Sequence, residues 1–282
     1  MTLLRRTAAV LVSMLAAALL AGPARAQETP PPQSSCLAMA QGIPGASFAR
    51  FKPAAVKLPV TLVQAGSGED VTITYAGHST YLIETPAGVR IATDFSGAYG
   101  RDPLPRVVTM NHAHSTHYSL NPDPGIEHVL QGWGDGNGPA KHLLQVDDVL
   151  VRNVPTDIRR GGMMEKDGNS IFIFEVAGLC IGHLGHLHHW LEDAHYAAIG
   201  RLDVVMVPID GGMTQSLPRM SEIVTRLSSS VVLPMHRFST SIEEFSTLMG
   251  ERFAVERHPS RSFSVSLRSL PRQATILVLE GV

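Results

Sequence analysis

Residues 106–118 read RVVTMNHAHSTHY, a short apolar strand pattern that runs directly into three histidines. The apolar run at residues 107–110 predicts a β-strand. Side chains two residues apart in an extended segment point the same way, so the imidazoles of His112 and His114 can reach one ion. His117 follows where the chain must leave the strand, and no carboxylate stands among the three. The stretch therefore predicts a metal site at the end of a strand.

The rest of the chain continues this pattern of strand ends that carry histidines. Strand patterns recur at residues 71–77, 80–85, 89–95, 126–132, 170–176, 179–183, 203–209 and 231–236. Helical patterns occupy residues 190–200, 217–229 and 241–250, and residues 132–141 are too rich in glycine for either. Strands first, followed by strands that alternate with helices, predict an α/β fold with helices covering the outer faces of sheets.

Two further histidines, His183 and His236, each end an apolar strand pattern. Open sheets place their binding sites where such strands end. Together with His112 and His114, His183 would give a zinc ion three imidazole ligands and leave a fourth position to water. This is the composition of a catalytic rather than a structural zinc site.

The composition is typical of a folded globular protein. The 282 residues are 44% hydrophobic with a formal net charge of -2, so the chain has no strongly basic surface of the kind that binds nucleic acid.

Residues 1–26 have the basic start, apolar stretch and small-residue cleavage site of a secretory signal. We therefore expect an exported, periplasmic protein without a stable membrane anchor after cleavage, a linker and N-terminal segment at residues 27–69, and a catalytic domain at residues 70–282. The oligomeric state is left open.

The two cysteines, Cys36 and Cys180, allow two interpretations. An exported protein could pair them in a disulfide. Because Cys180 lies in the apolar run AGLCIGH, we favour the alternative that it is a buried thiol in a strand.

Several ordered blocks of sequence carry a family resemblance. They are ITYAGHSTYLIET, RIATDFSG, TMNHAHSTH, GNSIFIFEVAGLCIGHLGH, LDVVMVPIDGG and VVLPMHRFST, over about residues 70–240. The chain resembles the metallo-β-lactamase superfamily, most of all the branch that contains ascorbate-phosphate lactonases and N-acyl-phosphatidylethanolamine phospholipase D type enzymes. The resemblance implies an αββα sandwich with the metal site at the edge of two mixed sheets.

The resemblance also implies roles for individual residues. It assigns His112, His114 and His183 to a first metal position, and His117 and His236 to a second. Asp94 would support the site from behind, and His78 would lie near the pocket.

Two departures from the family pattern concern the second metal position. The family aspartate in His-x-His-x-Asp-His is Thr116 here, and the metal-bridging aspartate is His186. Two divalent ions about 3.5–4 Å apart repel each other strongly without such carboxylates. We therefore expect one tightly bound zinc ion and an uncertain second ion, with a three-histidine site of His117, His186 and His236 as the competing possibility.

Other residues are candidates for the chemistry around the metal. Asp210 is a candidate general base, although an Asp before two glycines is more typical of a turn. His189 aligns with a family histidine and is a candidate proton shuttle. Trp133, in the glycine-rich loop, would either stack on a substrate or anchor the loop.

The predicted function is a metal-dependent hydrolase that attacks a small lactone, ester or phosphodiester with a metal-bound hydroxide. The alternative is a non-catalytic metal- or ligand-binding protein of the same fold, because both carboxylates of the second position are missing.

Overall fold

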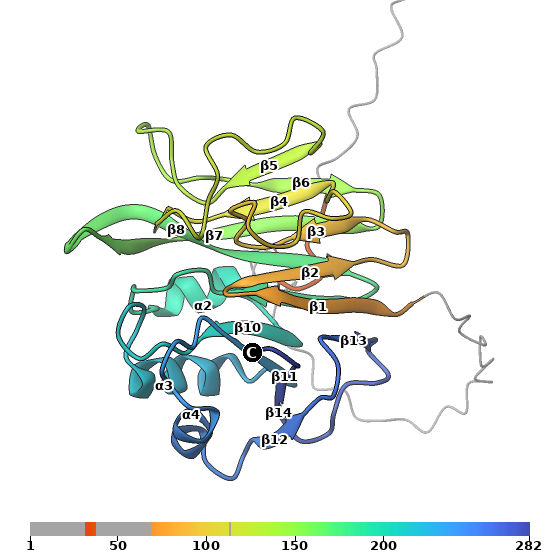
Figure 1. Ribbon diagram of the computed structural model, residues 1–282, viewed down its shortest axis with the longest axis vertical. Coiled ribbons are helices and arrows are strands. Elements are labelled where there is room, and N and C mark those ends of the chain that lie inside the picture. The colour runs from red at the N-terminus through yellow and green to blue at the C-terminus, as the bar shows by residue number, and fades with distance from the viewer. Residues whose placement is uncertain (1–31, 38–68, 113) are drawn as a thin grey trace, which may run out of the picture. The chain divides into compact units, whose positions relative to one another are not determined.

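Two β-sheets form the framework of the computed structural model, which describes residues 32–37, 69–112 and 114–282 (Figure 1). The described residues belong to one compact unit. Most of the predicted leader and linker, residues 1–31 and 38–68, lies outside the described residues. Among the residues that are described, no helix has both the length and the apolar character needed to span a bilayer.

The first sheet has six strands and is mixed. In spatial order its strands are β13 (Ser262–Val265), β1 (Val71–Gly77), β2 (Thr80–Glu84), β3 (Arg90–Ala92), β4 (Val107–Met110) and β5 (His128–Gln131). Strands β3, β4 and β5 are parallel, while β13, β1, β2 and β3 pair antiparallel. The histidine-rich segment leaves this sheet at the end of β4.

The second sheet has eight strands and supplies the other half of the site. Its spatial order is β12 (Ala254–Arg257), β14 (Thr275–Val278), β11 (Val231–Met235), β10 (Val204–Pro208), β9 (Leu179–His183), β8 (Met163–Val176), β7 (Val149–Arg160) and β6 (Leu143–Val146). Because β9, β10 and β11 are parallel, the loops that follow them emerge at one edge of the sheet.

The buried faces of the two sheets meet in the main core. Successive residues of β10 point to opposite faces, so Val204 and Met206 pack between the sheets while Val205 and Val207 pack on the outer face. Burial of both faces explains why this strand reads as a continuous apolar run.

The outer face of the second sheet is covered by the described helices. These are α2 (Asp193–Ile199), α3 (Leu217–Leu227) and α4 (Ile242–Met249), whose buried side chains join that core cluster. Ser241 caps α4 by accepting from the Glu244 N–H, and Gly200 ends α2 as its spacing predicts. The predicted sandwich of two mixed sheets at whose edge the site lies is confirmed, with β6, β7 and the C-terminal strands as additions that the sequence patterns did not indicate.

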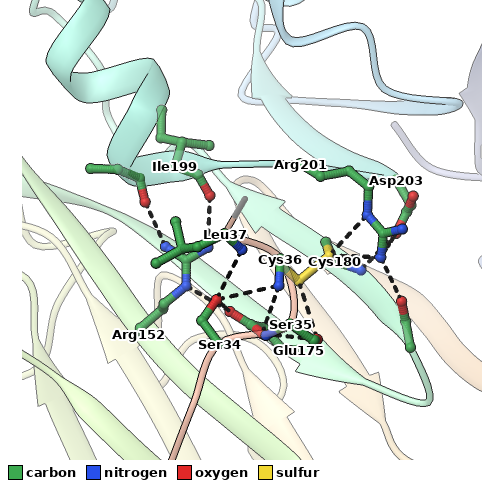
Figure 2. The surroundings of a disulfide bond; sticks show 12 residues. Ser34, Ser35, Cys36, Leu37, Arg152, Glu175, Cys180, Ile199, Arg201 and Asp203 are labelled. Atoms are coloured by element: carbon green, nitrogen blue, oxygen red, sulfur yellow. Dashed lines mark hydrogen bonds and ion pairs between the residues drawn. A yellow bond between two sulfur atoms is a disulfide. The ribbon is translucent and has the colours of Figure 1, made fainter. Parts of the chain in front are cut away.

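The interpretation of Cys180 as a free buried thiol is wrong. The structure joins Cys36 and Cys180 in a disulfide, with Cα atoms 5.9 Å apart (Figure 2). The partner comes from a segment 144 residues away in the chain, so local sequence around Cys180 could not reveal it.

A buried ion pair between Arg152 and Glu175 lies beside this disulfide. We call this pair, together with the N-terminal residues Ser34, Ser35 and Cys36 that bind it, the N-terminal anchor. The Arg152 guanidinium donates to Glu175 at 2.7 Å and to two backbone carbonyls at the end of α2. The Glu175 carboxylate also accepts from the Ser34 hydroxyl and the N–H groups of Ser35 and Cys36. Both charged groups of this anchor are therefore hydrogen-bonded to several partners (Figure 2).

Candidate metal centre

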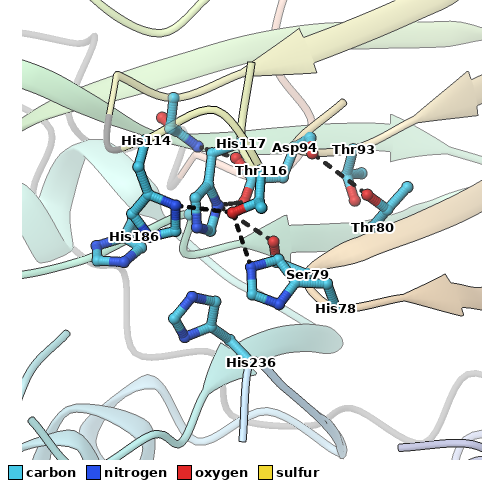
Figure 3. A network of polar contacts seen from close by, with 12 residues as sticks. His78, Ser79, Thr80, Thr93, Asp94, His114, Thr116, His117, His186 and His236 are labelled. Atoms are coloured by element: carbon cyan, nitrogen blue, oxygen red, sulfur yellow. Dashed lines mark hydrogen bonds and ion pairs between the residues drawn. The ribbon is translucent and has the colours of Figure 1, made fainter. Parts of the chain in front are cut away.

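Four histidines from three different loops come together at the edge of the two sheets. His114 and His117 follow β4, His186 follows β9, and His236 follows β11. One side-chain nitrogen from each lies within 4.8 Å of the others, and Figure 3 shows the four rings turned toward one another. We call these four residues the histidine cluster.

Two carboxylates fix the orientation of two rings in the cluster. The buried Asp94 accepts a hydrogen bond from Nδ1 of His117, and Asp210 accepts one from Nδ1 of His236 at 2.9 Å. Because an ionised carboxylate can only accept, both Nδ1 atoms carry a proton, and in the neutral ring each Nε2 then presents a lone pair. Neither Nε2 has a hydrogen-bond partner, although both are buried.

The two carboxylates remain ionised although they are buried. Burial alone would favour the neutral acid of Asp94, but the adjacent His117 outweighs it and holds the pKa of Asp94 well below its ordinary value. At Asp210 burial is likewise outweighed, by hydrogen bonds from His236, Gly212 and Thr214, so that its pKa is also far below the usual range. Both acids therefore supply fixed negative charge behind the cluster.

His186 reaches the cluster through a tight turn. Gly185 has φ +62°, and a Cβ there would lie 2.4 Å from the Asn169 side chain, so glycine is required for this close approach. The His186 N–H donates to Asn169, whereas both ring nitrogens are buried without a partner. Burial, reinforced by His117 and His236, lowers the pKa of His186 to about 2. The ring is therefore neutral and has a lone pair to offer.

His114 is the exposed member of the cluster and is linked to His78 through Thr116. The Thr116 hydroxyl lies 2.8 Å from Nδ1 of His114 and 3.1 Å from Nε2 of His78. Burial, together with neighbouring histidines, lowers the pKa values of His78 and His114 to about 4 each. Thr116, which stands where the family has an aspartate, thus bridges two neutral imidazoles.

Backbone strain concentrates around the histidine cluster. His78, Asp94, His236 and Phe238 have φ values of +55°, +50°, +48° and +48°, in the left-handed region that ordinary side chains avoid. Strain of this kind persists where the surrounding structure enforces it, commonly at functional sites.

The structure does not bring together His112, His114 and His183, the first metal position expected from the sequence. Nε2 of His183 donates to the Ser79 carbonyl at 2.8 Å, and its Nδ1 accepts from the Gly185 N–H at 3.0 Å, so both nitrogens are used. His112 turns to Glu165, 2.5 Å from Nδ1, and stacks on Trp133 with ring centroids 4.9 Å apart. The observed grouping contains instead the competing trio of His117, His186 and His236.

The two residues expected to exchange protons have structural partners of their own. One oxygen of Asp210 accepts from three backbone N–H groups of the turn at residues 212–214, and the other accepts from His236 and the Thr214 hydroxyl. Asp210 is therefore placed as a positioning residue for His236. His189 lies outside the cluster, with Nδ1 3.4 Å from the Asp157 carboxylate.

Several polar residues that support the site were not singled out from the sequence. Asn111 donates to Asp94 and accepts from the Ser170 N–H, which ties β4 to β8, and Glu165 holds His112. The strand-end position of Asn111 was a usable signal, because it directly precedes the histidine motif. Glu165 gave none, since its contact with His112 arises only from packing of the β7–β8 hairpin.

The histidine nitrogens without hydrogen-bond partners indicate whether the cluster can bind a cation. Buried side-chain nitrogens and oxygens without partners are rare, yet His117, His186 and His236 together contribute four of the five found among the described residues. Neutral imidazole nitrogens are the commonest protein ligands for transition metals. The donor set and the two carboxylates behind it therefore fit a divalent metal ion.

Comparisons with known proteins agree with this architecture. Residues 72–236, more than half of the chain, match the family described as the beta-lactamase superfamily domain. The chain belongs to this superfamily. The resemblance predicted from the sequence blocks is confirmed at this level, while the branch within the superfamily stays a prediction.

Individual proteins and one solved structure match much of the chain. A UPF0173 metal-dependent hydrolase of Pyrococcus furiosus is 24% identical over 221 residues, which cover 66% of this chain and 95% of that protein. A second, from Pyrococcus abyssi, is also 24% identical over 221 residues, with the same coverage of both chains. A crystal structure from Thermotoga maritima of the metallo-β-lactamase superfamily is 26% identical, with a TM-score of 0.51, and covers 74% of this chain and 98% of that one.

Proposed function

We propose that this protein is a metal-dependent hydrolase that holds one divalent ion, preferably zinc, with His114, His117, His186 and His236. The observation that carries the proposal is the set of buried imidazole nitrogens without partners, which lie within 4.8 Å of one another. Membership of the superfamily and the metal-dependent hydrolases among its similar members support it.

The charge balance of the site favours a divalent ion. Two ionised carboxylates, Asp94 and Asp210, accept hydrogen bonds from His117 and His236 on the side away from the proposed ion. Their two negative charges would balance the double positive charge of the ion. Their hydrogen bonds also keep each ring in the tautomer that presents Nε2 to the metal. When bound, the ion would act as a Lewis acid and lower the pKa of a coordinated water to about 7.

The remaining polar groups at the open side of the cluster would orient the substrate. Thr116 joins His114 to His78, so a single hydroxyl fixes both rings. His78 lies 4.4 Å from His236 between ring centroids, and its neutral ring can donate a hydrogen bond to a bound substrate.

The substrate class proposed is a small lactone, ester or phosphodiester, as the branch resemblance implies. Export to the periplasm is proposed from the leader pattern at residues 1–26. The Cys36–Cys180 disulfide supports it, because such bonds persist in oxidising compartments.

A second candidate function is metal binding without catalysis. Four imidazoles suffice to complete the tetrahedral shell of a zinc ion, and a complete shell is typical of structural sites. The exposed position of His114 favours the hydrolase, because this ligand can give up its place to a water molecule while the three buried histidines keep the ion.

Metal analysis and a substrate panel test the proposal together. We expect one zinc ion per chain after dialysis, and hydrolysis of an aryl ester, a γ-lactone or an aryl phosphodiester that is abolished by a chelator and by His117→Ala. His128→Ala, on β5 outside the cluster, is the matched control and should behave as the unaltered protein. One bound ion without turnover of any compound favours the second candidate, and the absence of a bound ion contradicts both.

A further inference from the structure

Phe238 combines two unfavourable features beside the histidine cluster. Its side chain is 54% exposed, and its backbone has φ +48°, a conformation that a bulky residue rarely adopts. Asparagine or glycine would avoid both of these costs. An exposed aromatic ring held on a strained backbone at the mouth of a site is therefore a candidate for contact with a ligand.

The ring of Phe238 is fixed against two histidines of the site. It lies edge-on to His236, with centroids 4.8 Å apart, and edge-on to His78 at 5.6 Å. The His236 N–H donates to the His78 carbonyl at 3.0 Å, which locks the backbone just before Phe238 to the β1–β2 turn. The exposed part of the ring therefore borders the space in front of the cluster.

A second exposed apolar side chain is tied to the same part of the site. Met213 is 44% exposed, and its N–H donates to Asp210, the carboxylate that orients His236. We call Phe238 and Met213 the apolar rim. The two residues come from different loops, after β11 and β10, and both are anchored on the Asp210–His236 pair.

We propose that the apolar rim binds an apolar acyl or aryl group next to the bond that is hydrolysed, so that the substrate is an ester or lactone with such a group. The inference rests on the proposed function of the histidine cluster. An apolar group placed there would cover the exposed faces of Phe238 and Met213 and remove apolar surface from water. The hydrogen bonds that tie the rim to Asp210 and His78 would hold the group in one orientation relative to the histidines.

Two chelating probes of different size separate this inference from the proposed function. Acetohydroxamate and benzohydroxamate carry the same zinc-binding group, but only the second carries a phenyl ring. Their dissociation constants would be measured by calorimetry on the zinc-loaded full chain, so that the result does not depend on turnover. Zinc content would be measured for every variant to show that the metal site is retained.

The variants compared are Phe238→Asn, which tolerates the left-handed backbone but lacks the apolar ring, and Phe238→Leu, which keeps an apolar side chain. Leu248→Ala, an exposed apolar residue on α4, is the control. We expect a preference for benzohydroxamate of about 10-fold, reduced to about 2-fold or less by Phe238→Asn, largely kept by Phe238→Leu and unchanged by Leu248→Ala.

An equal preference in the unaltered protein and in Phe238→Asn would overturn the inference and leave the proposed function intact. Failure of both hydroxamates to bind the zinc-loaded protein would overturn the proposed function, and the inference with it.

Discussion

The N-terminal anchor and the histidine cluster are both buried and polar, but their hydrogen bonding is opposite. In the anchor, Arg152 and Glu175 meet each other and several further partners, so that burial leaves no charged group unpaired. In the cluster, nitrogens of His117, His186 and His236 are buried without partners. A satisfied network stabilises the fold by itself, whereas the cluster carries a cost that only a bound ligand can offset.

The largest effect is expected from breaking the ion pair of the anchor. Glu175→Ala leaves the Arg152 guanidinium buried without its acid, which should lower the free energy of unfolding by about 3–5 kcal/mol. Urea unfolding of the oxidised protein measures this loss. Glu256→Ala, an exposed acid on β12, is the control and should change the free energy of unfolding by less than about 0.5 kcal/mol. A loss below about 1 kcal/mol for Glu175→Ala would show that the anchor does not stabilise the fold.

Removal of the disulfide should have the next largest effect. The bond joins residues 144 positions apart, so its loss frees a long loop of the unfolded chain, and Cys36→Ser should cost about 2–4 kcal/mol. Thermal unfolding with and without a reducing agent measures the effect. The reductant should destabilise the unaltered protein but not the variant, and equal sensitivity of both would contradict the assignment.

Metal binding should remove the difference between the two regions, because the ion would bind the histidine nitrogens that have no hydrogen-bond partner. Free zinc at about 100 times its dissociation constant should raise the free energy of unfolding of the metal-free protein by about 2.7 kcal/mol. Chemical unfolding at several zinc concentrations measures this increase. His236→Ala removes one of the buried ligands and should abolish most of the increase, whereas His258→Ala, distant in sequence and outside the cluster, should retain it.

The smallest effect is expected from making the cluster apolar. His186→Leu removes two buried nitrogens without partners, so it should stabilise the metal-free protein by about 1 kcal/mol at pH 7.5 while lowering zinc affinity. Unfolding of the variant and of the unaltered protein, both free of metal, measures the difference. A loss of stability would mean that the nitrogens are satisfied in solution.

The same variant should show a pH dependence of defined sign. Because the pKa of His186 is lowered to about 2 in the folded protein, only the unfolded chain binds a proton at this residue just below its ordinary pKa of about 6.5. The folded protein therefore loses stability through His186 as the pH falls from about 6.5 toward 2. His78 and His114, with pKa values lowered to about 4, act in the same direction. The stabilisation by His186→Leu should therefore grow by about 2 kcal/mol between pH 7.5 and pH 5.

Much of the fold could be predicted from local sequence. The continuous apolar run at residues 204–207 marks a strand, and Gly200 and Gly250 mark the ends of helices. Such elements can be recognised because their secondary structure depends mainly on neighbouring residues. Strands such as β12 and β13 are short and half exposed, so their apolar pattern is weak. These strands form because β14 and β1 are available beside them, and a local pattern does not record that.

The site shows the same division. The sequence by itself determined the fold class and the strand ends where histidines gather, because side-chain alternation and turn residues act over a few positions. Only the tertiary structure decided which imidazoles keep a free nitrogen. Both ring nitrogens of His183 are hydrogen-bonded, to Ser79 and Gly185, and His112 is hydrogen-bonded to Glu165. The ring nitrogens of His186, in contrast, have no partner. Such hydrogen bonds, like the bond between Cys36 and Cys180, join segments far apart in the chain, so they exist only once the two sheets have packed together.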